Sequence, residues 1–155
     1  MPATNASRLL TTAGIDHEVR AYDLATDDFS AEAVADAIGM PWSQVFKTLV
    51  AAGGSGPVFA VVPAGTELDL KALAAAAGER GMGMVAVGDL ERITGYRRGG
   101  VTVIGAKKRL PVYLDISAVD AGRIAVSAGA QGMQVVLAAD DYLAVTAATL
   151  ARIAR

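Results

Sequence analysis

The 155-residue chain contains no cysteine, one histidine and few aromatic residues, which make up 5% of it. Without cysteine, the chain has no disulfide, no zinc–thiolate centre and no thiol nucleophile. One histidine excludes a polyhistidine metal centre within a single chain. The sequence also lacks a Gly-x-Ser-x-Gly nucleophile motif and any acidic cluster with the spacing of a metal-binding loop. We therefore expect an activity that uses no metal and no cofactor.

The chain also lacks a membrane-spanning segment, although 53% of its residues are hydrophobic and its mean hydropathy is +0.40. The longest uncharged run, 48–66, is interrupted by glycines and prolines and predicts two strands joined by a turn. The N-terminus shows no basic region followed by an apolar core, so we expect no signal peptide and a cytoplasmic location. A net charge of −2 argues against binding of RNA by long-range attraction to the whole surface, so any contact with nucleic acid needs a local basic patch.

Helix and strand signals alternate irregularly along the chain, which predicts an α+β fold in one domain covering residues 1–155. Caps and apolar periodicity predict helices at 5–13, 31–39, 70–77, 89–95 and 141–153. The strand patterns lie at 15–22, 45–52, 58–62, 84–87, 101–104, 112–115, 124–127 and 134–138.

A glycine-rich basic segment, 94–111, combines backbone that can approach a ligand closely with five cationic side chains. The cations are Arg97, Arg98, Lys107, Lys108 and Arg109. Backbone donors and clustered positive charge favour an anionic or phosphate-bearing ligand. The alternative is a hairpin turn with a solvated charged edge.

Lys47 stands within the apolar strand Val45-Phe46-Lys47-Thr48-Leu49-Val50, whose two faces are both expected to be buried. Lysine is rarely buried unless it is paired or functional. The alternatives are an edge lysine that extends to water and one that protects the strand from aggregation.

Taken in order, several motifs resemble the YbaK-type aminoacyl-tRNA deacylases, the prolyl-tRNA synthetase-associated editing domains. The matching pieces are Val45-Phe46-Lys47-Thr48-Leu49, Leu68-Asp69-Leu70-Lys71, Thr94-Gly95-Tyr96 with Gly99-Gly100, Gly105 with Lys107-Lys108-Arg109-Leu110-Pro111, Asp115, and Ser127 with Gly129 and Gly132. The similarity runs from Leu9 to about Ile153.

The resemblance implies a mixed β-sheet curled towards a barrel with helices around it, and a hydrolase that deacylates misacylated tRNA, foremost Cys-tRNA(Pro). Lys47 would be the catalytic cation that offsets charge on the ester carbonyl. The substrate-binding residues would be Tyr22, Thr48, Tyr96, Gly99, Gly100, Ser127 and Gly129, and the five cations of segment 94–111 would contact tRNA. Expected partners are aminoacyl-tRNA(Pro) and prolyl-tRNA synthetase.

Two departures from the family pattern border the expected pocket. Thr102-Val103 stand where relatives often carry a Ser-Pro pair, and Ala128 and Gln131 replace a glycine and a basic residue. These changes leave open Ala-tRNA(Pro) or another small aminoacyl-tRNA as substrate. A catalytically silent module that binds tRNA or a synthetase is a further alternative. Tyr22 also fits an amphipathic residue at a strand edge.

Overall fold

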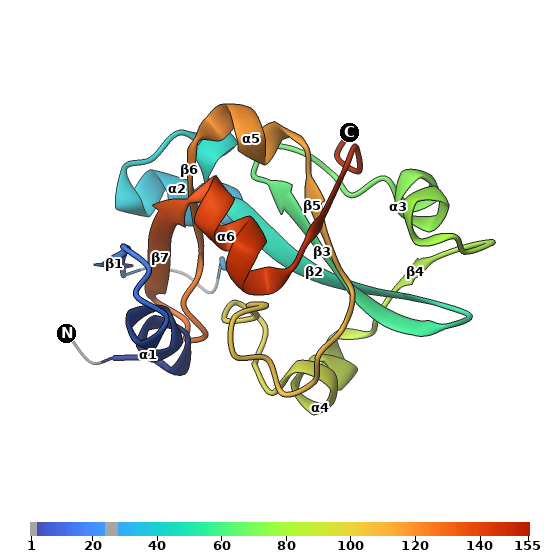
Figure 1. The fold of residues 1–155 in the computed structure, drawn as a ribbon, viewed down its shortest axis with the longest axis horizontal. Coiled ribbons are helices and arrows are strands. Elements are labelled where there is room, and N and C mark those ends of the chain that lie inside the picture. The colour runs from blue at the N-terminus through green and yellow to red at the C-terminus, as the bar shows by residue number, and fades with distance from the viewer. Residues whose placement is uncertain (1–2, 24–27) are drawn as a thin grey trace.

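Two β-sheets form the framework of the protein in a computed structural model that describes residues 3–23 and 28–155. The smaller sheet has the order β1-β7-β6 and the larger has the order β4-β2-β3-β5-β8 (Figure 1). The strands are β1 Glu18–Ala21, β2 Phe46–Gly53, β3 Gly56–Pro63, β4 Gly83–Met84, β5 Val112–Asp115, β6 Arg123–Ser127, β7 Met133–Ala138 and β8 Thr149–Ala151.

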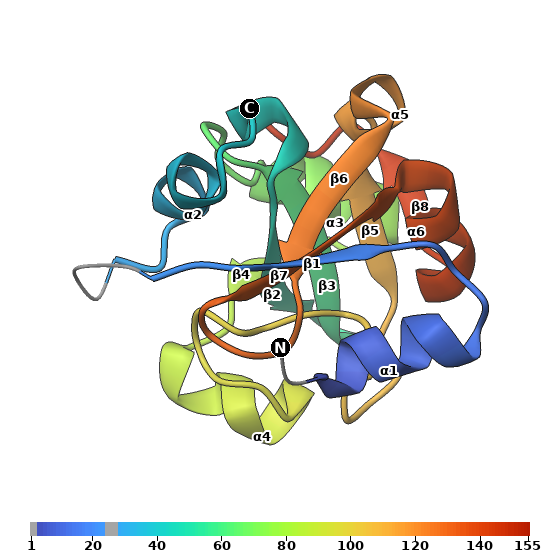
Figure 2. The same ribbon diagram turned by 90° about the vertical axis from the view of Figure 1, so that its left-hand side faces the viewer.

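Six α-helices and two 3-10 turns surround the sheets in the described residues. The helices are α1 Asn5–Thr12, α2 Ala31–Ile38, α3 Leu70–Ala77, α4 Leu90–Thr94, α5 Ser117–Ala121 and α6 Ala139–Thr146, and the turns are η1 Trp42–Gln44 and η2 Val87–Asp89. Figure 2 shows α1 and α4 on one side of the sheets, and α5 on the opposite side. None of the described helices is long and apolar enough to cross a membrane.

The main core lies between the two sheets and is closed by α1 and α6. Phe46, Val50 and Phe59 from β2 and β3 meet Ile124 and Leu137 from β6 and β7 in one cluster of buried side chains. The opposite face of the β2–β3 hairpin packs under α3, where Leu73 contacts a second cluster that contains Ala51 and Val62. Both faces of β2 were expected to be buried, and both do contribute to buried clusters, but Lys47, Thr48 and Leu49 are only half-buried. The α+β class is confirmed.

The expectation of one sheet curled towards a barrel is wrong. The described strands form two separate sheets, and the pairing between them is a single parallel bridge between Val45 and Ala125. Beyond this bridge, β2 pairs with β3 and β4, whereas β6 pairs with β7. The two sheets part because their backbone groups are satisfied within each sheet, and side chains fill the space between them.

Two secondary-structure predictions near the C-terminal half are also wrong. The predicted strand 101–104 is a buried irregular segment, because Val101, Thr102 and Ile104 fill the core without pairing in a sheet. The predicted helix 141–153 is replaced by α6, which ends at Thr146, and by β8, which pairs in parallel with β5. Backbone pairing with β5 outweighs the helix propensity of the alanine-rich tail. The sequence prediction also missed α5.

The capped helices agree closely with the predictions. Thr4, Ser30 and Asp69 each accept a hydrogen bond from a backbone N–H in the first turn of α1, α2 and α3. The predicted hairpin around Gly53 is present, with β2 and β3 paired from Phe46 and Pro63 to Gly53 and Gly56. The first strand, predicted at 15–22, is present as the shorter β1.

Candidate functional site

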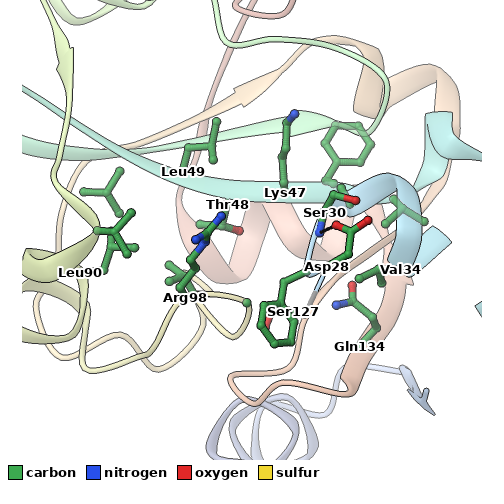
Figure 3. A pocket seen from close by; sticks show the side chains of 18 of the residues that line it. Asp28, Ser30, Val34, Lys47, Thr48, Leu49, Leu90, Arg98, Ser127 and Gln134 are labelled. Atoms are coloured by element: carbon green, nitrogen blue, oxygen red, sulfur yellow. Dashed lines mark hydrogen bonds between the residues drawn. The ribbon is translucent and has the colours of Figure 1, made fainter. Parts of the chain in front are cut away.

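A cavity of about 370 Å³ opens where the two sheets part. Strand β2 supplies one wall, the ends of β6 and β7 supply a second, and the start of α2 and two loops close the sides (Figure 3). The lining residues are Asp28, Phe29, Ser30, Ala31, Val34, Val45, Phe46, Lys47, Thr48, Leu49, Val50, Met84, Val85, Val87, Leu90, Arg98, Gly99, Val101, Ser127 and Gln134. Its volume is in the range of pockets for small ligands or for one end of a larger one.

Lys47 lines this cavity, but its ammonium group is held at one side of it. Lys47 Nζ donates a hydrogen bond to the carbonyl oxygen of Thr66 at 2.7 Å. The neighbouring Gly65 N–H donates to Glu32 Oε1 at 2.9 Å, and this bond is the main cause of the lowered pKa of Glu32, to which the positive charge of Lys47 also contributes. The cation is therefore positioned by the 65–66 loop and by a carboxylate that stays ionised at neutral pH.

Thr48 lies next to Lys47 and points to the other face of β2 (Figure 3). Its hydroxyl is a neighbour of the buried Tyr142 phenol, yet neither group has a hydrogen-bond partner of good geometry among the described residues. Burial raises the pKa of Tyr142, with a smaller opposing effect from Thr48. The Thr48 side chain therefore lines the cavity with its hydroxyl buried beside the Tyr142 phenol.

Ser127 ends β6 at the cavity, and its hydroxyl accepts a hydrogen bond from the Gly129 N–H at 3.1 Å. The only histidine, His17, lines a separate hollow with Arg8 and Thr11, and its Nδ1 is 2.9 Å from the carbonyl oxygen of Ile15. Ser127 thus has no histidine base beside it. The serine shapes the cavity and offers a hydroxyl to a ligand.

Gly99 and Gly100 bring three loops together at the cavity rim. A Cβ added at Gly99 would stand 2.8 Å from Cγ of Phe29, and one at Gly100 would stand 3.3 Å from the backbone of Ala130. Gly99 also has a φ of +84°, which side chains rarely tolerate. Glycine at these positions permits the contact between the 98–101 loop, residue 29 and the 128–132 loop.

Four of the predicted substrate-binding residues are not among the residues that line the cavity: Tyr22, Tyr96, Gly100 and Gly129. Tyr96 supports the loops instead, because its hydroxyl donates to the carbonyl oxygen of Ile104 at 2.8 Å and its ring lies against Gly129. Tyr22 packs against the α2 cluster, and its N–H donates to Gly132 O at 2.9 Å. Gly129 does not line the cavity, but its N–H donates a hydrogen bond to the hydroxyl of Ser127, which does.

Of the five predicted tRNA-binding cations, Arg98 alone lines the cavity. Arg97 is exposed and forms an ion pair with Glu91 at 3.1 Å. The backbone of Lys107 lies beside the end of α4, because its N–H donates to the carbonyl oxygen of Thr94 at 2.8 Å. Lys108 and Arg109 follow on the exposed surface. The structure therefore brings Lys47, Thr48, Arg98, Gly99 and Ser127 together and places the other predicted residues around them.

Sequence reasoning missed several residues that line the cavity, above all Asp28, Ser30 and Gln134. The Asp28 carboxylate accepts a hydrogen bond from the Ser30 N–H at 3.0 Å, and hydrogen bonds from Ser30 lower its pKa. Gln134 is 5% exposed and directly faces Ser127 across the β6–β7 pair. A polar side chain in an otherwise apolar strand was the signal that could have found Gln134, as it found Lys47.

Comparison with known proteins places this fold and cavity in a defined class. Residues 27–145 match the aminoacyl-tRNA editing domain family, and the chain belongs to that family. A relative from Enterococcus faecalis, EbsC, is 42% identical over 151 residues, which cover 97% of this chain and 92% of the relative. EbsC is named provisionally as a Cys-tRNA(Pro)/Cys-tRNA(Cys) deacylase.

Solved structures share the same fold. A protein named provisionally as a trans-editing enzyme for prolyl-tRNA synthetase superposes with a TM-score of 0.86 at 24% identity, covering 100% of this chain and 99% of the other. The hypothetical protein APE2540 superposes with a TM-score of 0.87 at 16% identity, covering 97% and 99% of the two chains. At these identities the structural likeness concerns the fold alone.

Proposed function

We propose that this protein is a trans-editing hydrolase that cleaves the ester between a wrong amino acid and tRNA, with Cys-tRNA(Pro) as its foremost substrate. The observation that carries the proposal is the 42% identity to EbsC over almost the whole chain. The cavity supports it, because Lys47, Thr48 and Ser127 line one site without a cysteine or a Ser–His pair. The reaction then depends on positioning and on stabilising charge rather than on a protein nucleophile.

In this proposal Lys47 is the catalytic cation. Its ammonium group is anchored to the carbonyl oxygen of Thr66 by one of its three N–H bonds, so the others can reach the ester carbonyl when substrate is bound. A positive charge there stabilises the oxyanion that forms as water, or the thiol of a cysteinyl substrate, attacks the carbonyl carbon. Ser127 supplies a hydroxyl that holds the substrate, and the Thr48 side chain forms part of the wall against which the aminoacyl group lies.

The basic residues around the cavity provide the tRNA contact in this proposal. Arg98 lies at the cavity, and Arg97, Lys107, Lys108 and Arg109 extend from it over the surface. With a net charge of −2, the chain has little long-range attraction for a polyanion, so we propose that prolyl-tRNA synthetase supplies additional tRNA selectivity in the cytoplasm.

The proposal is tested by incubating the purified protein with Cys-tRNA(Pro) and Ala-tRNA(Pro) and measuring the release of each amino acid. Release above the spontaneous rate is expected, with Cys-tRNA(Pro) the better substrate. Faster release from Ala-tRNA(Pro) than from Cys-tRNA(Pro) would make alanine the preferred amino acid, with the same mechanism. Tight binding of tRNA without release from either substrate would favour a silent binding module.

A further inference from the structure

The side-chain amide of Gln134 is a buried polar group without a partner at its carbonyl oxygen. Gln134 is 5% exposed, and its Oε1 has no hydrogen-bond partner among residues 3–23 and 28–155. Buried polar atoms are nearly always paired, so an unpaired one that lines a cavity points to a ligand donor. The position is well defined, because Gln134 pairs with Ser127 across β6 and β7 and both side chains face the cavity.

The cavity has a negatively charged side chain on one side and a positively charged one on the other. Figure 3 shows Asp28, Ser30 and Gln134 on one side of Ser127, and Arg98 on the other. The Asp28 carboxylate is an anion whose pKa is lowered by its bonds to Ser30. One side of the cavity thus offers oxygen acceptors and negative charge, whereas the other offers a guanidinium group.

Arg20 is the other cross-strand neighbour of Gln134, on β1. Its guanidinium is already engaged, since Nε lies 2.7 Å from Glu18 Oε1 and Nη1 donates to the carbonyl oxygen of Ile38 at 3.2 Å. Arg20 is also not among the residues that line the cavity. It therefore leaves the acceptor of Gln134 available to a ligand.

We propose that Gln134 Oε1 accepts a hydrogen bond from the α-ammonium group of the aminoacyl substrate. This inference rests on the proposed function, and it also sets the orientation of the substrate. The α-ammonium group is a donor that all aminoacyl esters share; it has three N–H bonds in most of them and two in a prolyl ester, where the nitrogen lies within a ring. The ammonium lies beside Gln134 and Asp28, and the phosphate of the terminal nucleotide lies towards Arg98.

Gln134 is therefore a residue that recognises the α-amino group and not the side chain of the amino acid. It acts with Lys47 on β2 of the other sheet, because holding the ammonium also positions the ester carbonyl, which is bonded to the same α-carbon. A substrate that lacks the ammonium would leave the Gln134 carbonyl buried and unpaired, which is a costly arrangement.

Binding of two stable amide analogues tests the proposal without requiring turnover. The probes are 3′-(L-cysteinylamino)-3′-deoxyadenosine and its 3-mercaptopropionyl counterpart, which differs only in lacking the α-amino group. Calorimetry should show that the wild-type protein binds the cysteinyl probe at least about tenfold more tightly. Q134M should bring the ratio of the two affinities close to one, whereas Q134E should keep it or raise it.

Q44M is the matched control, because the Gln44 amide donates to the carbonyl oxygens of Ala121 and Arg123, and Gln44 is not among the residues that line the cavity. It should leave the ratio unchanged. Equal affinity of the wild type for both probes, failure to bind either, or an equal loss for both probes in Q134M would overturn the inference. Thermal melting shows whether Q134M is folded. If it is unfolded, the ratio of the two probe affinities in the wild type and in Q134E tests the inference. Release of amino acids from tRNA is scored separately, so loss of the proposed function and loss of this contact give different results.

Discussion

The ammonium group of Lys47 is bonded to the carbonyl oxygen of Thr66 at 2.7 Å, on the loop that follows β3. This bond fixes a cation at the wall of a cavity within an otherwise apolar strand. Strand β2 fixes the backbone of Lys47, and the hydrogen bond to Thr66 fixes the position of its ammonium group. A lysine is tolerated in β2 because its ammonium group has a hydrogen-bond partner. Replacing Lys47 therefore tests what its charge does in the cavity.

Lys47→Ala should lower the deacylation rate at least about tenfold, which corresponds to about 1.4 kcal/mol in the barrier, because the cation that stabilises the oxyanion is lost. Single-turnover kinetics with misacylated tRNA measure the effect. Lys71→Ala, on the exposed face of α3, is the control and should keep the wild-type rate. Unchanged kinetics in a folded Lys47→Ala protein would reduce Lys47 to a structural residue.

Gly99→Ala should destabilise the protein and slow deacylation, because the new Cβ meets the Phe29 ring at 2.8 Å while φ remains at +84°. Gly39→Ala is a matched control, since Gly39 has a similar φ of +70° but no atom within 4 Å of the added Cβ. Urea unfolding should therefore show an extra cost of about 1 kcal/mol at Gly99. An equal loss of stability in the two variants would mean that the contact with Phe29 does not matter.

Arg98→Ala should weaken tRNA binding and reduce the slope of log affinity against log salt by about one, because one phosphate contact is lost. Since Arg98 lines the cavity, the variant should also bind a minimal aminoacyl-adenosine 5′-phosphate less well. Arg97→Ala should affect full-length tRNA alone, because Arg97 is exposed and is not among the residues that line the cavity. Arg155→Ala is the control, because Arg155 is exposed at the C-terminus and is not among the residues that line the cavity. An unchanged salt slope in Arg98→Ala would place the tRNA footprint elsewhere.

Asp115 is a buried carboxylate that ties β5 to the C-terminal segment. Its oxygens accept hydrogen bonds from the N–H groups of Ile153, Ala154 and Ser117 and from the Ser117 hydroxyl. Burial raises its pKa, but these bonds outweigh burial, and the pKa is lowered overall. Asp115 forms no ion pair with Lys108 or Arg109 among the described residues.

Asp115→Asn should lower the free energy of unfolding at pH 7 by about 2 kcal/mol, because an amide cannot accept all four bonds. A folded pKa below the unfolded value of about 3.9 means that this stabilisation is complete above about pH 5 and is lost as the pH falls towards the folded pKa. The difference between wild type and variant should therefore shrink at pH 3 in urea titrations. The exposed Asp120→Asn is the control, and a difference that stays constant with pH would contradict the account.

Local sequence signals predicted the capped helices and the β2–β3 hairpin, and they singled out Lys47 because a charge in an apolar strand is conspicuous. They did not predict β8 or the division into two sheets, since both depend on pairing between segments far apart in the chain. Gln134 was missed for a related reason. An uncharged amide in a strand draws attention only when the structure shows that its oxygen is buried and unpaired and that the residue lines a cavity.

Discrimination between Cys-tRNA(Pro) and Pro-tRNA(Pro) tests the central claim most directly. The measurement is kcat/KM for release of each amino acid from the same tRNA by the purified wild-type protein. The account predicts rapid release of cysteine, with Pro-tRNA(Pro) left largely intact. Release of both amino acids at equal rates, or release of neither above the spontaneous rate, would contradict an editing function for this cavity.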